Sequence, residues 1–158
     1  MFRVGFGNDI HRLVAGAPLI IGGVAVESEV GADGHSDADV LLHALTDALL
    51  GALALGDIGT HFPNEEERWL NAESSVFLRY ALGLIKSHGY SIVNIDSTVS
   101  LERPKLREYV DAMRENIAKA LEINVSQVSI KAKTGEKLDS VGEGTAVRAE
   151  AVVLLAQT

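Results

Sequence analysis

Apolar residues recur at two different periods along this chain, and the switches between these periods constrain the fold most strongly. Strand-like segments occupy residues 2–12, 18–26, 90–101, 128–134 and 145–156. Helical spacing of three and four predicts helices over residues 36–54, 72–88 and 104–124. The predicted order ββααβαββ indicates an α+β fold with helices layered against a mixed sheet. We expect the first two strands to form a hairpin, and a single domain over residues 1–158.

The net negative charge of the chain comes entirely from its first half. The chain has 14 Lys+Arg and 22 Asp+Glu, a net charge of −8; residues 1–79 hold 4 and 12 of these, and residues 80–158 hold 10 of each. This excess of negative charge argues against nucleic-acid binding that relies on Lys and Arg side chains to neutralise phosphates. The segment between Arg12 and Arg68 contains ten acids and three histidines but no Lys or Arg. Such a composition is typical of either a solvated acidic face or a cation site.

Cysteine is absent, so a thiolate nucleophile and a Cys-ligated metal are excluded, and histidines and carboxylates remain as the strong metal ligands. No stretch of 18 apolar residues and no apolar signal-peptide core occurs. We therefore expect a cytoplasmic protein that neither spans a membrane nor binds nucleic acid.

One candidate metal site combines a strand with the first predicted helix. Asp9 and His11 are two residues apart on a strand, so their side chains leave the same face, and His43 lies on the helix. If that helix packs across the strand, the three side chains converge and leave a fourth tetrahedral position open. In the alternative interpretation, Asp9 caps a turn and the two histidines pack separately.

The start of this helix offers a second kind of site. His35 and Ser36 lie where free backbone N–H groups of a helix N-terminus would favour a phosphate. Asp39 and Asp47 stand four residues on either side of His43 and share its helix face. They are candidates to orient a metal-bound histidine, although an exposed acidic face would show the same pattern.

Five segments together form a far more specific pattern. They are D-x-H at residues 9–11, HSDADVLLHALTDALLGA at 35–52, GDIGTHFP at 56–63, PK at 104–105 and KAKTGEK at 131–137. The pattern spans essentially the whole chain and resembles the 2-C-methyl-D-erythritol 2,4-cyclodiphosphate synthases, enzymes of the non-mevalonate isoprenoid pathway.

The resemblance implies a role for each matching position. Asp9, His11 and His43 match a divalent-metal triad, usually zinc, and Glu136 matches a ligand of Mg²⁺ or Mn²⁺ at the diphosphate. His35 and Thr134 match two catalytic residues that stabilise the transition state. The implied substrate-binding residues are Asp9, His11, His35, Ser36, Asp57, Gly59 and the flap residues Phe62, Pro63, Asn64 and Glu66. A neighbouring subunit is expected to supply the cytidine pocket through Leu101, Pro104, Lys105, Leu106 and Arg107. Lys133, Thr134 and Glu136 complete the implied substrate-binding residues.

The implied reaction is that of a lyase, which cyclises 4-diphosphocytidyl-2-C-methyl-D-erythritol 2-phosphate and releases CMP. The implied assembly is a homotrimer around a central channel, with active sites between subunits. The chain departs from the family pattern at Leu101, Asn64 and Gly135. The loop at 138–144 also lacks an arginine that helps other members bind an isoprenoid diphosphate in the central cavity, so that ligand is left open.

Two other functions fit the same residues. A zinc phosphohydrolase would admit water at the open metal position and release linear phosphate products. A non-catalytic trimeric protein could instead bind isoprenoid diphosphates in its central cavity.

Overall fold

A mixed five-stranded sheet forms the centre of the protein. The computed structural model describes residues 1–63, 66 and 69–158. The strands are β1 (Phe2–Ala15), β4 (Val30–Asp33), β5 (Tyr90–Ser100), β6 (Val128–Lys133) and β7 (Ala146–Gln157). Their order across the sheet is β4-β1-β7-β5-β6, and the β5–β6 pair is parallel while the other pairs are antiparallel.

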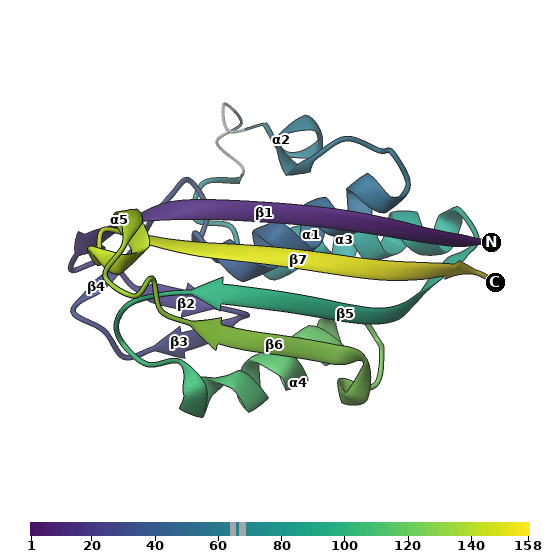
Figure 1. The fold of residues 1–158 in the computed structure, drawn as a ribbon. Coiled ribbons are helices and arrows are strands. Elements are labelled where there is room, and N and C mark those ends of the chain that lie inside the picture. Colours follow the sequence, from purple (N-terminus) through teal and green to yellow (C-terminus); the bar gives the residue numbers. More distant parts are fainter. Residues whose placement is uncertain (64–65, 67–68) are drawn as a thin grey trace.

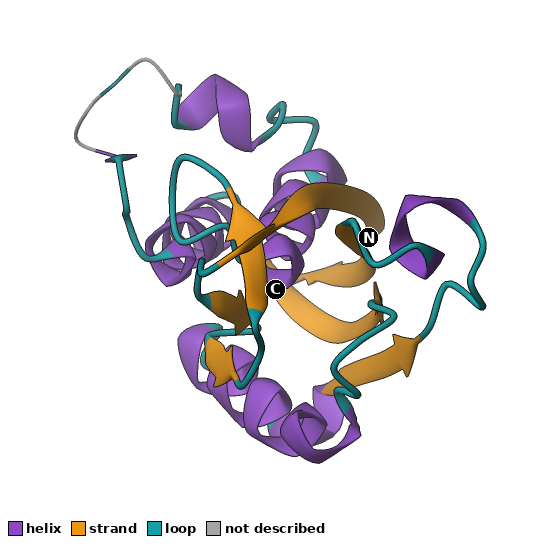
Figure 2. Cartoon of the chain, turned by 90° about the vertical axis from the view of Figure 1, so that its left-hand side faces the viewer, coloured by secondary structure: helices purple, strands orange, loops and turns teal. Residues whose placement is uncertain are grey.

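Three long helices lie on one side of this sheet, as Figures 1 and 2 show. They are α1 (Val40–Ala52), α3 (Ser74–Ser87) and α4 (Val110–Ala120). Short helices α2 (Ile58–His61) and α5 (Asp139–Gly142) and 3-10 turns at Arg107–Tyr109 and Val125–Gln127 lie in the connections. The predicted α+β class, with helices layered on a mixed sheet, is therefore confirmed.

The predicted hairpin between the first two strands is wrong. The segment 18–26 folds on itself as β2 (Leu19–Ile21) and β3 (Val24–Val26), which pair only with each other, while β1 pairs with β4 and β7. Gly22 and Gly23 make this turn with φ angles of 60° and 72°, which residues with a Cβ rarely adopt. Because of this turn and the extra β4, the element order is longer than the predicted ββααβαββ.

Two glycines of β1 let α1 lie unusually close to the sheet. A Cβ atom on Gly5 would stand 1.8 Å from the carbonyl oxygen of Ala48, and one on Gly7 would stand 2.1 Å from that of Ala44. This Gly-Phe-Gly segment lacks the third glycine of a dinucleotide-binding motif. Its glycines instead remove side chains from the α1–β1 contact, which brings His43 over the strand that carries the D-x-H pair.

The opposite face of the sheet is partly apolar on β1 and β7, and none of the three long helices covers it. Alternate residues of β1 and β7 point away from the helices. Five large apolar side chains among them are between 42% and 70% exposed: Phe2, Val4, Phe6, Ile10 and Val152. The helices of the described residues are all too short or too polar to cross a membrane.

Candidate active site

Three side chains that can bind a metal converge where α1 crosses β1. Asp9 and His11 leave the helix-facing side of β1, and His43 comes from the first turn of α1. The carboxylate Oδ2 of Asp9 lies 2.9 Å from both His11 Nε2 and His43 Nδ1, and these two nitrogens are 3.2 Å apart. The predicted convergence is confirmed, and the alternative in which the two histidines pack separately is wrong.

The electrostatics of this cluster favour positive charge. Burial alone would raise the pKa of Asp9, but the hydrogen bonds and charges of His11 and His43 outweigh it and hold this pKa well below its usual range. Burial also opposes charge on His11, whereas its hydrogen bond with Asp9 and the negative charge there raise its pKa. A bound cation would take the place of such protons, because metal ligands must be deprotonated.

The donor set fits a divalent cation. Each residue offers one ligand atom, and the three atoms lie within 4.8 Å of one another. Two imidazole nitrogens and one carboxylate oxygen suit a zinc-type ion, and three protein ligands leave a coordination position open to a substrate. Within the described ranges, this is the one group of three or more His, Asp or Glu side chains with such an arrangement.

The metal cluster opens on a cavity of about 280 Å³. Its lining includes seven predicted site residues: Asp9, His11, His35, Ser36, His43, Gly59 and Phe62. The ring nitrogen Nε2 of His35 is buried and makes no hydrogen bond with the part of the chain that the structure describes. Because a buried polar atom is costly without a partner, this nitrogen is well suited to meet a bound ligand.

Helix α2 brings the second predicted group of residues to this cavity. Gly59 lies in its lining, whereas Asp57 does not, because its carboxylate caps α2 and accepts bonds from Thr60 N and Oγ1 at 2.8 and 2.7 Å. These hydrogen bonds hold the pKa of Asp57 below its usual range. Asp47 accepts a 2.7 Å bond from Ile58 N, so it anchors α2 rather than orienting His43.

Phe62 closes one side of the cavity as a buried side chain. It follows directly on α2, which ends at His61. The ring of Phe62 packs on those of Phe77 and Trp69, with centroids 4.5 and 5.0 Å apart. Phe77 and Trp69 also line the cavity, although the sequence pattern did not indicate them.

The other predicted flap residues lie beyond this lining. Pro63 accepts a backbone hydrogen bond from Glu66 at 3.1 Å, and neither residue lines the cavity. Asn64 lies outside the described residues.

Most of the residues predicted for the cytidine pocket lie with Lys133, Thr134 and Glu136 around a separate cavity of about 340 Å³ at the carboxyl ends of β5 and β6. It is lined by Leu101, Lys105, Leu106, Arg107, Ala132, Lys133, Thr134 and Glu136. Leu101 and Leu106 are buried, whereas the three cationic side chains are exposed. Thr134 donates a 2.5 Å hydrogen bond to Glu136, and Pro104 follows a cis peptide bond without lining the cavity. The two cavities share no lining residue, so one chain holds two separate halves of the predicted site.

The start of α1 differs from the prediction. His35 and Ser36 precede the helix by several residues, and Asp39 provides the N-cap instead. Asp39 is fully buried and also accepts hydrogen bonds from the backbone N–H groups of Gly22 and Gly23, at 2.9 and 2.6 Å. Its carboxylate therefore neither belongs to an exposed acidic face nor bonds to the His43 ring.

Comparison with known proteins identifies the family. The family model described as the YgbB family matches residues 2–156. The chain belongs to the YgbB family. Among its relatives in the family, the 2-C-methyl-D-erythritol 2,4-cyclodiphosphate synthase of Solibacter usitatus (strain Ellin6076) is 54% identical over 97% of this chain and 96% of its own.

Two solved structures show the same fold. The bifunctional IspDF from Campylobacter jejuni superposes with a TM-score of 0.96 at 36% identity, covering 100% of this chain and 43% of that one. A 2C-methyl-D-erythritol-2,4-cyclodiphosphate synthase in its CDP-bound form superposes with a TM-score of 0.90 at 40% identity, covering 98% and 100%. Because its relatives within the family are synthases over their full length, this YgbB protein is an enzyme.

Proposed function

We propose that this enzyme converts 4-diphosphocytidyl-2-C-methyl-D-erythritol 2-phosphate to 2-C-methyl-D-erythritol 2,4-cyclodiphosphate and CMP. The observation that carries the proposal is the Asp9, His11 and His43 cluster, which opens on a cavity beside the unpartnered Nε2 of His35. The names of the relatives that match over nearly the whole chain supply the product, and the family resemblance supplies the substrate.

The reaction joins two anionic groups of one molecule. An oxygen of the 2-phosphate attacks the β-phosphorus, a new P–O bond closes the ring, and the bond from the β-phosphorus to the oxygen of CMP breaks. Divalent cations held by the Asp9 cluster and by Glu136 would neutralise and polarise the phosphates. The chain then needs no covalent nucleophile, and its residues act mainly by positioning the substrate.

His35 and Thr134 are the proposed catalytic residues of this reaction. The buried Nε2 of His35 would donate to a phosphate oxygen of the substrate, and Ser36 lies beside it in the same lining. Thr134 stands in the second cavity beside Glu136, the proposed Mg²⁺ or Mn²⁺ ligand. A single carboxylate is enough for such an ion when substrate phosphates and waters complete its coordination.

A homotrimer with sites between subunits would unite the two cavities. The separation of the metal cavity from the cavity around Lys105 and Lys133 supports this assembly, since a substrate must meet both. The uncovered apolar face of β1 and β7 supports it too, because contiguous exposed apolar surface marks interaction sites. The solved relative bound to CDP supports a cytidine nucleotide as the ligand of the second cavity.

The isoprenoid diphosphate in a central cavity has weaker support. Arg148, a cation on the outward face of β7, already lies 3.5 Å from the carboxylate of Asp139 in α5. This ion pair leaves less positive charge for a diphosphate at the altered loop.

Product analysis tests the proposed reaction. The purified enzyme with Zn²⁺ and Mg²⁺ should turn the diphosphocytidyl substrate into a cyclic diphosphate and CMP, followed by ³¹P NMR. Linear phosphate products would instead indicate the zinc phosphohydrolase, and no product from folded, metal-loaded trimer would indicate a binding protein. His35→Ala should lower turnover by about a hundredfold with the fold intact, as for the loss of one positioned donor.

A further inference from the structure

A chain of hydrogen bonds leads away from His43 on the side opposite the metal cluster. Its Nδ1 faces Asp9, while its other ring nitrogen, Nε2, lies 2.8 Å from the hydroxyl oxygen of Ser74. The Ser74 hydroxyl donates to a carboxylate oxygen of Asp37, and the Ser74 backbone N–H donates to the other oxygen at 3.0 Å. Ser74 is fully buried, so these bonds are shielded from water.

The carboxylate at the end of this chain sets the direction of every bond in it. A carboxylate only accepts, so the Ser74 hydroxyl must give its hydrogen to Asp37. The hydroxyl oxygen of Ser74 is then left to accept the N–H of His43 Nε2, and this bond is shorter than the 3.1 Å between Nε2 and the hydroxyl oxygen of Ser36. Without a metal, Nδ1 shares a hydrogen with the Asp9 carboxylate, 2.9 Å away. When a cation displaces that hydrogen, the bond at Nε2 keeps the remaining ring hydrogen there and leaves the Nδ1 lone pair for the metal.

We propose that Asp37 and Ser74 are positioning residues, which hold His43 in the tautomer and ring orientation that bind the metal. This inference rests on the cation site of the proposed function. It also replaces the sequence-based candidates for this role, since Asp39 and Asp47 bond to backbone N–H groups elsewhere. Spacing could not reveal the pair, because Ser74 lies 31 residues beyond His43 and 37 beyond Asp37.

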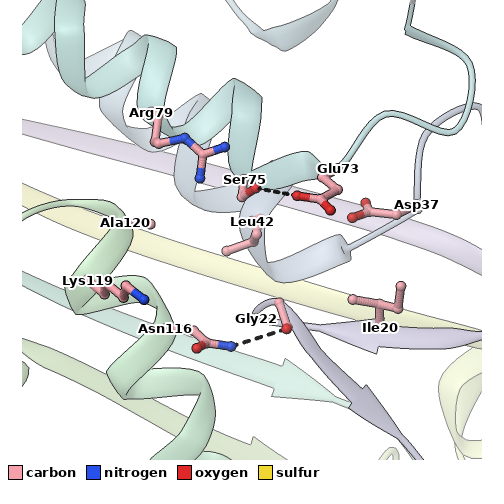
Figure 3. A pocket seen from close by; sticks show the side chains of 11 residues that line it. Ile20, Gly22, Asp37, Leu42, Glu73, Ser75, Arg79, Asn116, Lys119 and Ala120 are labelled. Atoms are coloured by element: carbon pink, nitrogen blue, oxygen red, sulfur yellow. Dashed lines mark hydrogen bonds between the residues drawn. The ribbon is translucent and has the colours of Figure 1, made fainter.

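Asp37 also has a structural role at the start of α3, which experiments must distinguish from its effect on His43. By accepting the Ser74 N–H it caps the first turn of α3. It lines a cavity of about 480 Å³ between the β2–β3 turn, α3 and α4, together with Glu73 and Ser75. Figure 3 shows these three side chains at the same end of that cavity.

Glu73 and Ser75 provide matched controls. They repeat the carboxylate–hydroxyl pair at the same helix end, with Ser75 donating to Glu73 at 3.4 Å, and neither is bonded to His43. Glu73→Gln and Ser75→Ala should therefore disturb the α3 terminus without changing the imidazole.

The first test reads the tautomer directly. The ¹⁵N chemical shifts of the His43 ring in the Zn²⁺-loaded wild-type enzyme should report a hydrogen on Nε2 and none on Nδ1. A hydrogen on Nδ1 would overturn the proposal without any variant. Asp37→Asn removes the acceptor that sets the direction, so the Nδ1–H form should become populated in that variant.

The second test measures metal affinity by competition of Zn²⁺ with a chelator. Ser74→Ala and Asp37→Asn should weaken binding by about 10- to 100-fold, while Ser74→Thr, which keeps the hydroxyl, and both controls should bind like the wild type. Unchanged affinity and tautomer in both variants, with a lower melting temperature, would assign Asp37 and Ser74 to capping alone. A wild type that binds no Zn²⁺ would refute the proposed metal site, whereas a Zn²⁺-loaded wild type with a hydrogen on Nδ1 would refute the positioning role alone.

Discussion

Substitution of Gly7 by alanine should separate the two elements that build the metal cluster. The new Cβ would stand 2.1 Å from the carbonyl oxygen of Ala44, whereas real Cβ atoms essentially never come within 3.0 Å. Helix α1 must therefore move from β1 by about 0.9 Å at this point. His43 belongs to the same helix turn as Ala44 and would move with it, away from Asp9 and His11.

The expected size of the effect follows from this displacement. Overpacking of a core contact costs about 1–3 kcal/mol, which lowers the melting temperature of a chain of this length by about 2–12 °C. Metal–ligand distances tolerate only about 0.2 Å, so Zn²⁺ affinity should fall at least tenfold. Thermal unfolding and chelator competition measure the two quantities on the same preparation.

Gly51→Ala is the matched control within α1. A Cβ there would lie 3.9 Å from the carbonyl oxygen of Phe6, an ordinary contact, and alanine is the better helix former by about 1 kcal/mol. This variant should retain the metal and melt no lower than the wild type. Wild-type Zn²⁺ affinity in Gly7→Ala would refute the claim that the close α1–β1 contact assembles the cluster.

Three further predictions test other parts of the structure. Asp39→Ala should destabilise the fold by about 3 kcal/mol in urea unfolding, because four backbone N–H groups lose their buried acceptor; a loss below about 1 kcal/mol would contradict this. Lys105→Ala should weaken CDP binding in calorimetry and leave Zn²⁺ affinity unchanged. Lys137→Ala, outside the cavity lining, should change neither affinity. Equal losses of CDP affinity in the two variants would argue against CDP binding in the second cavity. A hydrogen bond from Lys131 lowers the pKa of Asp96, so this pair stabilises the fold above the usual pKa of 3.8 and loses the effect as the pH falls below it. Because both side chains are about half exposed, Asp96→Asn should cost at most about 0.5 kcal/mol at pH 7 and nothing at pH 2, and a larger loss at pH 2 would contradict the sign.

Local pattern was enough to predict the long elements and the identity of the metal ligands. The period of the apolar residues depends only on the repeat of a strand or helix, so the main strands and two of the long helices were found within a few residues. The helix predicted from residue 104 begins only at Val110, after a 3-10 turn. The metal cluster could be predicted because Asp9 and His11 share a strand face and His43 follows on the first long helix.

The partners of these elements could not be predicted in the same way. The hairpin prediction failed because the segment 18–26 turns back on itself at two glycines. The alternation of apolar and polar residues along a strand does not indicate which strand pairs with it. The close contact between α1 and β1 likewise depends on two glycines whose role is visible only once a helix lies on them.

The sequence by itself thus determined the α+β class, the family pattern and the Asp9, His11 and His43 triad. Only the tertiary structure decided that Asp37 and Ser74 stand behind His43, that Asp39 is a buried cap, and that the predicted substrate residues divide between two cavities. The physical reason is that spacing encodes which face a side chain leaves. Contacts between residues far apart in the chain depend on how whole elements pack.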